Sequence, residues 1–374
     1  MTSQLIVAAV HDMFAGVLHP RQVVSLTHAV LGVVHAGQAG VASIGRAGAA
    51  ARQVAPKHGI KQFDRFLSND LFPMEDAVES LLAFTVGARE EVTVVLDWTD
   101  YPGQHRIALN LITDHGRATP LLWKTVTSAE LTDRRNEHED QLLRVFKRLL
   151  PAHVRKVVVL ADRGFGDVKR YQMLKGELGF DFVIRFRECV LVEAPSGETH
   201  PASEWVPSNG RQKWIPHARV TCQRIEIAAV VAMKSSGMKD NWLLATSLEA
   251  PPNEIVALYG RRFSIEENFR DEKDWRFGLG SRHVRIRRPD RRDRLCFVIA
   301  LATMLLTLLG RAGEQLGLDK RLRANTSKRR THSFFRQGRE YLRGVHGDLA
   351  LALLHAFATL LDDHPKTSAA NSLL

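Results

Sequence analysis

The chain has 374 residues, of which 45% are hydrophobic and 25% are charged, which is an ordinary composition for a soluble globular protein with a sizeable core. Its 52 lysines and arginines outnumber its 41 aspartates and glutamates, and the formal net charge of +11 favours a polyanionic partner such as nucleic acid. Its three cysteines lie far apart, which argues against a disulfide framework or a structural zinc site and fits a reducing cytoplasm.

Neither a leader nor a membrane span is predicted. The first residues, MTSQLIVAAVHDMF, contain no basic segment followed by an apolar stretch, and so predict no signal peptide. The uncharged run LCFVIALATMLLTLLG covers residues 295–310 and is shorter than the roughly 18–20 apolar residues that span a bilayer. We therefore expect a buried helix between Arg294 and Arg311, and no membrane partner.

Residues 1–86 are predicted to be helical, because they are rich in Ala and Gly and poor in strand-forming residues. The segment AARQVAPKHGIKQFDRFLSND carries cations among apolar residues, at Arg52, Lys57, Lys61 and Arg65. This pattern suits a small DNA-binding module. The solvated surface of a helical bundle would account for the same charges.

The pattern changes at residue 92, where VTVVLD forms a β-branched run that ends in Asp97. Two further strands, RIALNLIT and ATPLLWKTV, follow at hairpin distances. A charged helix, the strand KVVVLAD ending at Asp162, another helix and the strand DFVIRF come next. Three strands followed by alternating helix and strand predict an α/β fold with a mixed sheet flanked by helices, in the order of a ribonuclease H-like core.

Short strands and many turn residues predict a β-rich insertion over 187–240, before the strand WLLATS and a helix after PPNE. The remainder is helical and opens with a basic run, RFGLGSRHVRIRRPDRRDR. We expect a helical N-terminal DNA-binding domain at 1–86 and the first part of the catalytic core at 87–186. The β-rich insertion follows at 187–240, the second part of the core at 241–280, and a basic segment with a helical C-terminal region at 281–374.

Two aspartates, Asp97 and Asp162, end two hydrophobic strands. If the strands are neighbours, the carboxylates come together, and each raises the pKa of the other unless a cation lies between them. Oxygen ligands of this kind suit Mg²⁺ or Mn²⁺. Either aspartate could instead be a helix or turn cap.

A third carboxylate belongs to the segment YGRRFSIEENFRDEK. Tyr259, Arg262, Glu266 and Lys273 are spaced so that all four share one narrow face of a helix. An exposed face with an Arg262–Glu266 ion pair would explain the charges but not the tyrosine.

These residues form the Y-x2-R-x3-E-x6-K pattern, and the chain here resembles the insertion-sequence-4 family of transposases. DWT at Asp97 is similar to that family's D-x-T motif, and LADRGFGD is similar to its second-aspartate motif. NWLLATS resembles the strand before the glutamate helix, and FDRFLSND resembles part of the N-terminal module. The resemblance covers roughly residues 20–310, with its motifs in the family's order.

The resemblance implies that Asp97, Asp162 and Glu266 are a DDE triad that holds two Mg²⁺ ions, with Mn²⁺ as a substitute. The implied reaction is metal-dependent DNA hydrolysis and strand transfer, which together move an insertion element by cut-and-paste transposition. The partners would be double-stranded DNA, as terminal inverted repeats and target, and a second copy of the chain in the synaptic complex. The expected location is the bacterial cytoplasm, at the nucleoid.

The resemblance also implies DNA contacts. Tyr259, Arg262 and Lys273 would contact phosphates of the cleaved end, and Trp242 would stack on an extruded base, although it could equally pack in a buried strand. The basic run from 282 to 294 could follow the phosphate backbone, or it could be a solvated turn. The further residues expected to contact DNA are Arg163, Arg285, Arg287 and Arg288.

Neighbouring acids are assigned other roles. Asp100 falls on the opposite strand face from Asp97, and Glu267 is out of register with the helix face. Asp167 is expected to cap a helix, and Asp271 to lie at the surface. Two other functions fit the same motifs: a catalytically silent transposition inhibitor or domesticated transposase, and a ribonuclease H-like nuclease without strand transfer.

Overall fold

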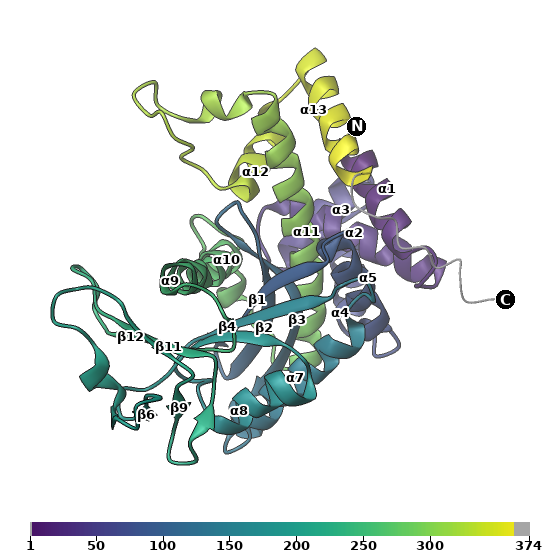
Figure 1. Cartoon of the computed structure of the whole chain (residues 1–374). Helices are drawn as coiled ribbons and strands as arrows, with labels where there is room; N and C mark the ends of the chain where they lie inside the picture. The colour runs from purple at the N-terminus through teal and green to yellow at the C-terminus, as the bar shows by residue number, and fades with distance from the viewer. Residues whose placement is uncertain (1, 363–374) are drawn as a thin grey trace.

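The computed structural model describes residues 2–362, which form helices around a mixed sheet of eight strands (Figure 1). The strand order is β3-β2-β1-β4-β5-β12-β11-β8. β1 to β3 form an antiparallel meander, and β4 and β5 run parallel to β1. The first five strands in sequence are β1 (Glu91–Tyr101), β2 (Gln104–Ile112), β3 (Ala118–Thr127), β4 (Lys156–Ala161) and β5 (Asp181–Arg185). The predicted α/β class with a mixed, ribonuclease H-like sheet is confirmed.

The region 187–240 contributes strands to two sheets. β8 (Lys213–Pro216) and β11 (Ala229–Met233) pair with each other, and β11 pairs with β12 (Trp242–Thr246), so that all three extend the large sheet. A separate sheet of four short strands has the order β10-β9-β6-β7. Its strands are β6 (Leu191–Glu193), β7 (Thr199–Pro201), β9 (Arg219–Val220) and β10 (Ile225–Glu226).

The N-terminal helices pack closely because glycines lie where two of them cross. A Cβ atom on Gly59 would lie 2.1 Å from the carbonyl oxygen of Gly45, so only glycine fits there without a shift of the backbone. The five helices are α1 (Thr2–Phe14), α2 (Pro20–Ala36), α3 (Val41–Ala50), α4 (Pro56–Leu67) and α5 (Met74–Val86).

Further helices connect and cover the strands. After the meander come α6 (Ser128–Leu131) and α7 (Arg135–Leu149), and β4 leads into α8 (Val168–Gln172) and a π-helical turn, Met173–Glu177. The segment after β12 forms α9 (Pro252–Gly260), a 3₁₀ turn (Arg261–Phe263) and α10 (Ser264–Lys273), where the spacing had predicted one helix. The break follows Gly260, because glycine has low helix propensity.

Within residues 2–362, α11 (Pro289–Gln315) alone is long and apolar enough to cross a membrane. Its apolar part is nearly all buried inside the protein, where it packs against α2, β3, α12 (Phe334–Gly344) and α13 (Asp348–Asp362). Figure 1 shows it running behind the sheet as a central helix. It is the core helix expected for residues 295–310.

Candidate active site

Asp97 and Asp162 belong to two adjacent parallel strands, Asp97 within β1 and Asp162 directly after β4. Leu96 of β1 is paired with Ala161 of β4, so Asp97 and Asp162 are the next residues at the same edge of the pair. Asp97 is held by the backbone N–H of Trp98, which donates to its Oδ1 at 2.8 Å. Asp162 accepts a 2.8 Å hydrogen bond from the backbone N–H of Gly164. Asp162 directly follows the end of β4, but β1 continues to Tyr101, so the predicted strand end at Asp97 is wrong. Asp97 is held inside β1, because this strand stays paired with β2 beyond it.

Arg262 links the first aspartate to the glutamate of α10. Its Nη1 lies 3.1 Å from Oδ2 of Asp97, and its Nη2 lies 2.9 Å from Oε1 of Glu266. The Arg262 side chain is 9% exposed, whereas the Glu266 side chain is 53% exposed. The buried side of the site is thus a fixed aspartate–arginine pair, and the glutamate faces solvent.

The electrostatics at Asp97 reflect three nearby charges. The pKa of Asp97 is raised to about 6, chiefly by burial; Arg262 opposes this rise, and the charges of Asp162 and Glu266 contribute to it. All three carboxylates therefore lie close enough to influence one another, and a cation among them would relieve their repulsion.

A divalent cation suits this set of donors. Asp97, Asp162 and Glu266 offer only carboxylate oxygens, which are the ligands that Mg²⁺ and Mn²⁺ prefer. Among residues 2–362, no three acidic, histidine or cysteine side chains already converge on one point. The cation between Asp97 and Glu266 in this structure is the Arg262 guanidinium.

Tyr259 and Lys273 connect the same helices to the sheet. Tyr259 is buried, its ring meets Trp242 edge-on at 5.0 Å, and burial raises its pKa to about 12. Trp242 is half-buried and also stacks on Phe263 with centroids 6.1 Å apart. Lys273 donates to the Thr99 hydroxyl at 2.7 Å. The four residues of the signature are brought to one side of the site, with Tyr259 inside the protein.

Comparison with known families agrees with this geometry. Residues 91–305, from β1 into α11, match the family model described as the transposase DDE domain. The chain belongs to this family. No curated protein matches it. A transposase DDE domain implies transposition, DNA binding and, in general, phosphoryl transfer with divalent metal ions.

The transposase domain contains a buried acid that the sequence analysis did not single out. Glu139 of α7 is 1% exposed and accepts hydrogen bonds from the Trp98 indole at 2.7 Å and from Arg170 at 2.6 Å. Burial raises its pKa to about 7, against the effects of Trp98 and Arg170. Glu139 is spaced from Leu142, Leu143 and Phe146 so that it lies on the buried face of an amphipathic helix. This spacing is the sequence pattern from which its burial could have been predicted.

One of the neighbouring acids is not where we expected it. Asp271 is buried and pairs with Arg117 at 2.9 Å, so its predicted surface position is wrong. Its side of α10 packs against β3, where a charge needs a partner. The predicted cap is confirmed, because Asp167 accepts the backbone N–H of Arg170 at 2.9 Å. Asp100 is exposed and pairs with His105 at 2.7 Å.

Basic side chains line two hollows of the transposase, most of them exposed and one, Arg292, buried. A cleft of about 620 Å³ lies between the β1–β2 turn and the basic segment, and its lining includes Arg282, Arg285, Arg287 and Arg292. Arg163 is exposed in the loop after β4, whereas Arg288 pairs with Asp70 and Asp290. On α2 and α4, a hollow of about 480 Å³ is lined by the cations Arg21, Lys61 and Arg65, with His58 beside them.

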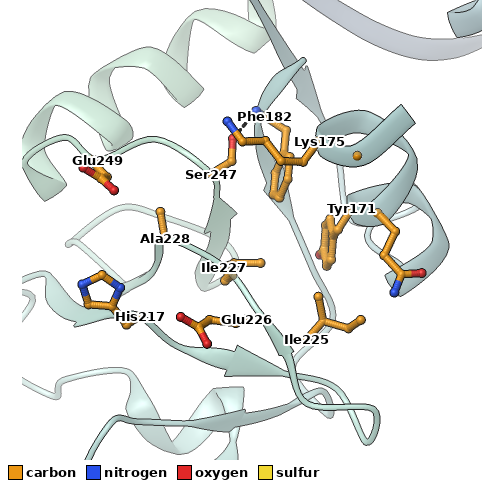
Figure 2. Close-up of a pocket in the computed structure, with 12 residues that line it drawn as sticks. Tyr171, Lys175, Phe182, His217, Ile225, Glu226, Ile227, Ala228, Ser247 and Glu249 are labelled. Carbon is orange, nitrogen blue, oxygen red and sulfur yellow. Dashed lines mark hydrogen bonds between the residues drawn. The ribbon is translucent and has the colours of Figure 1, made fainter. Parts of the chain in front are cut away.

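A third hollow has a different charge. Figure 2 shows Tyr171 and Lys175 on one side of it and Glu226 and Glu249 on the other. Lys175 is paired with Asp181 at 2.8 Å. Because acids face this hollow, it is less suited to a polyanion than the two lined by arginines.

Proposed function

We propose that this protein is a cut-and-paste transposase of the insertion-sequence-4 kind, with Asp97, Asp162 and Glu266 as its catalytic and metal-holding residues. The observation that carries the proposal is that Asp97 and Asp162 follow a paired Leu96 and Ala161 on the adjacent strands β1 and β4, with Arg262 joining Asp97 to Glu266. The match to a transposase DDE domain supports it.

In the proposed reaction, the three carboxylates would hold two Mg²⁺ ions, or Mn²⁺ in their place. Bound divalent ions activate the attacking water or 3′-hydroxyl and stabilise the leaving oxygen. The protein's own groups position the DNA and neutralise its charge. Arg262 and Lys273 would serve the phosphates of the cleaved end, with Tyr259 packed beneath them, and Trp242 would offer the exposed part of its ring to an unpaired base.

The remaining DNA contacts would come from the basic surfaces. We assign the terminal repeats to the helices of residues 1–86, where cations line the hollow on α2 and α4. Arg163, Arg285, Arg287 and Arg288 would contact phosphates beside the catalytic core. Two element ends must be held together, so the active complex would contain at least two copies of the chain. We place this complex at the nucleoid of a bacterial cytoplasm.

The test is an excision assay in cells, with a resistance marker flanked by the gene's native neighbouring DNA. Wild type should move the marker, whereas Asp162→Ala and Glu266→Gln should abolish movement. Asp100→Asn and Glu267→Gln are matched controls, because these acids are close in sequence to the triad but have other partners. If the control variants lose activity as completely as the triad variants, the assignment of the triad is wrong.

A second function, a catalytically silent DNA-binding regulator, would fit the same basic surfaces. It would be favoured if the wild-type protein bound the flanking DNA but produced no excision and no cleavage with Mg²⁺ or Mn²⁺. Cleavage without joining would favour a ribonuclease H-like nuclease.

A further inference from the structure

Two large aromatic rings project from the loop that follows α10. Trp275 is 67% exposed and Phe277 is 63% exposed. Two large aromatic side chains exposed two residues apart make this loop a candidate binding surface, because soluble proteins seldom leave large apolar area in water without a use for it.

The loop is fixed from within. The Asp274 carboxylate accepts the backbone N–H groups of Arg276 and Phe277, both at 2.7 Å. The N–H of Gly280 donates to the Asp274 carbonyl oxygen at 2.9 Å. A Cβ atom on Gly278 would lie 2.3 Å from the carbonyl oxygen of Asp271, so the turn requires glycine there. The rings are therefore presented by a preformed turn.

The loop is also anchored to two other parts of the fold. Arg339 of α12 donates to the carbonyl oxygen of Gly278 at 3.0 Å. The N–H of Ala39, in the segment after α2, donates to the carbonyl oxygen of Leu279 at 2.7 Å. With its backbone held on both sides, the loop pays little conformational entropy when a ligand binds to its rings.

The surroundings of the rings are cationic. The Arg276 guanidinium lies 5.0 Å from the Trp275 ring centroid, and Arg270 and Arg282 are also exposed nearby in the chain. Aromatic faces interleaved with arginines are the combination that binds single-stranded nucleic acid, through base stacking and backbone attraction. A duplex keeps its base faces stacked inside, so the rings could meet them only where bases are unpaired.

The aromatic loop also lies close to the proposed catalytic residues. Lys273, directly before the loop, is seven residues after Glu266, or about 10 Å along the helix at its usual rise. Trp242, by contrast, is half-buried between Tyr259 and Phe263. The two aromatic groups are thus distinct, and the rings of the loop are the more exposed of the two.

We propose that Trp275 and Phe277 form a stacking site for unpaired nucleobases of single-stranded DNA beside the cleaved end. This inference rests on the proposed function for the identity of its ligand. It adds a binding site that the DDE signature does not include.

The test uses the full-length protein in EDTA, so that cleavage plays no part in the measurement. The probes are a blunt duplex of the native flanking DNA and the same duplex with a single-stranded adenine tail that contains 2-aminopurine. Wild type should bind the tailed probe more tightly and quench the 2-aminopurine. Trp275→Ala and Phe277→Ala should each lower affinity for the tailed probe about tenfold and leave the blunt probe unaffected.

Two further variants sharpen the test. Trp275→Phe should retain most of the binding, because a smaller ring still stacks. Leu351→Ala, at a side chain of α13 that is 52% exposed, removes an exposed apolar group elsewhere and should change neither probe. Equal losses on both probes, or no loss on either, would overturn the inference. So would a change in the oligomeric state of DNA-free Trp275→Ala, because the rings would then join two copies of the chain.

The outcomes also separate this inference from the proposed function. Wild type that binds neither probe would defeat both. Tail-specific stacking by a protein that never excises the marker would defeat the transposase proposal alone. Excision by a wild type whose ring variants bind both probes normally would defeat the stacking site alone.

Discussion

The indole nitrogen of Trp98 donates to the buried carboxylate of Glu139 at 2.7 Å, and this bond ties α7 to the residue that follows Asp97. The same carboxylate accepts from Arg170 of α8, the helix that the loop after Asp162 leads into. The guanidinium of Arg135, also on α7, lies over the Trp98 ring, 5.0 Å from the ring centroid. Glu139 is therefore a positioning residue between the segments that carry the two aspartates.

Replacing Glu139 with Leu should destabilise the protein by about 3–5 kcal/mol, because Arg170 would be left buried with only one acidic partner. Urea unfolding at pH 8 measures this change. Glu137→Gln is the matched control on the same helix, since Glu137 is 63% exposed and pairs only with Arg134 at the surface. Equal stability of the two variants would show that Glu139 has no such role.

Arg262 holds two carboxylates that we assign to metal ions. Arg262→Ala should lower the melting temperature in EDTA, because Asp97 would remain buried without its cation. Mn²⁺ should then raise the melting temperature of this variant more than that of wild type, since the ion replaces the missing positive charge.

Arg270→Ala is the control for this experiment, because Arg270 is 60% exposed and pairs with Glu267 outside the triad. Its response to Mn²⁺ should equal that of wild type. An Mn²⁺ effect on Arg262→Ala that survives the additional change Asp97→Asn would place the ion elsewhere.

The fold class and the meeting of the two aspartates followed from local sequence. VTVVLD and KVVVLAD are runs of buried-strand residues that end in an acid, and adjacent parallel strands bring such ends together. The length and order of the runs predicted the strands, but that β1 and β4 are neighbours, and that β1 continues past Asp97 to Tyr101, is settled by pairing between distant residues.

Other features depend on contacts between distant residues. Arg262 and Asp97 are 165 positions apart, so their ion pair cannot be derived from the helical spacing that paired Arg262 with Glu266. Asp271 was expected at the surface because it falls outside the triad motif, and the partner that buries it, Arg117, is 154 positions away. β8 and β11 look like other short strands of their region, and only pairing assigns them to the large sheet.

Adding a methyl group where α3 and α4 touch should lower the stability of the protein. Gly59→Ala would place a methyl group 2.1 Å from the carbonyl oxygen of Gly45, and the helices would have to separate. We expect a loss of about 1–3 kcal/mol in the free energy of unfolding. Gly344→Ala, near the end of α12, is the control, because its new methyl group would contact nothing within 4 Å. Similar results for both variants in urea would mean that the helices do not touch at these glycines.

Titration of the Asp293 carboxyl group, on α11, should make the free energy of unfolding depend on pH. Its carboxylate accepts the backbone N–H of Thr125 at 3.0 Å, and burial raises its pKa to about 7, although Thr125 and Arg106 lower it. Below about pH 4 both folded and unfolded chains hold this proton, so the group adds no pH dependence there. Between about pH 4 and pH 7 only the folded state keeps the proton, so stability falls as pH rises, and above pH 7 the loss is complete.

Asp293→Asn should remove this loss, so that from pH 4 to pH 8 the variant gains roughly 2–4 kcal/mol relative to wild type. Asp290→Asn should act in the opposite direction, because Arg288 and Arg294 hold the pKa of Asp290 below its usual value and its charge stabilises the fold at neutral pH. Urea unfolding of the three proteins across this pH range measures both effects. A wild-type and an Asp293→Asn curve that run parallel would mean that Asp293 is already ionised in the folded protein at acidic pH.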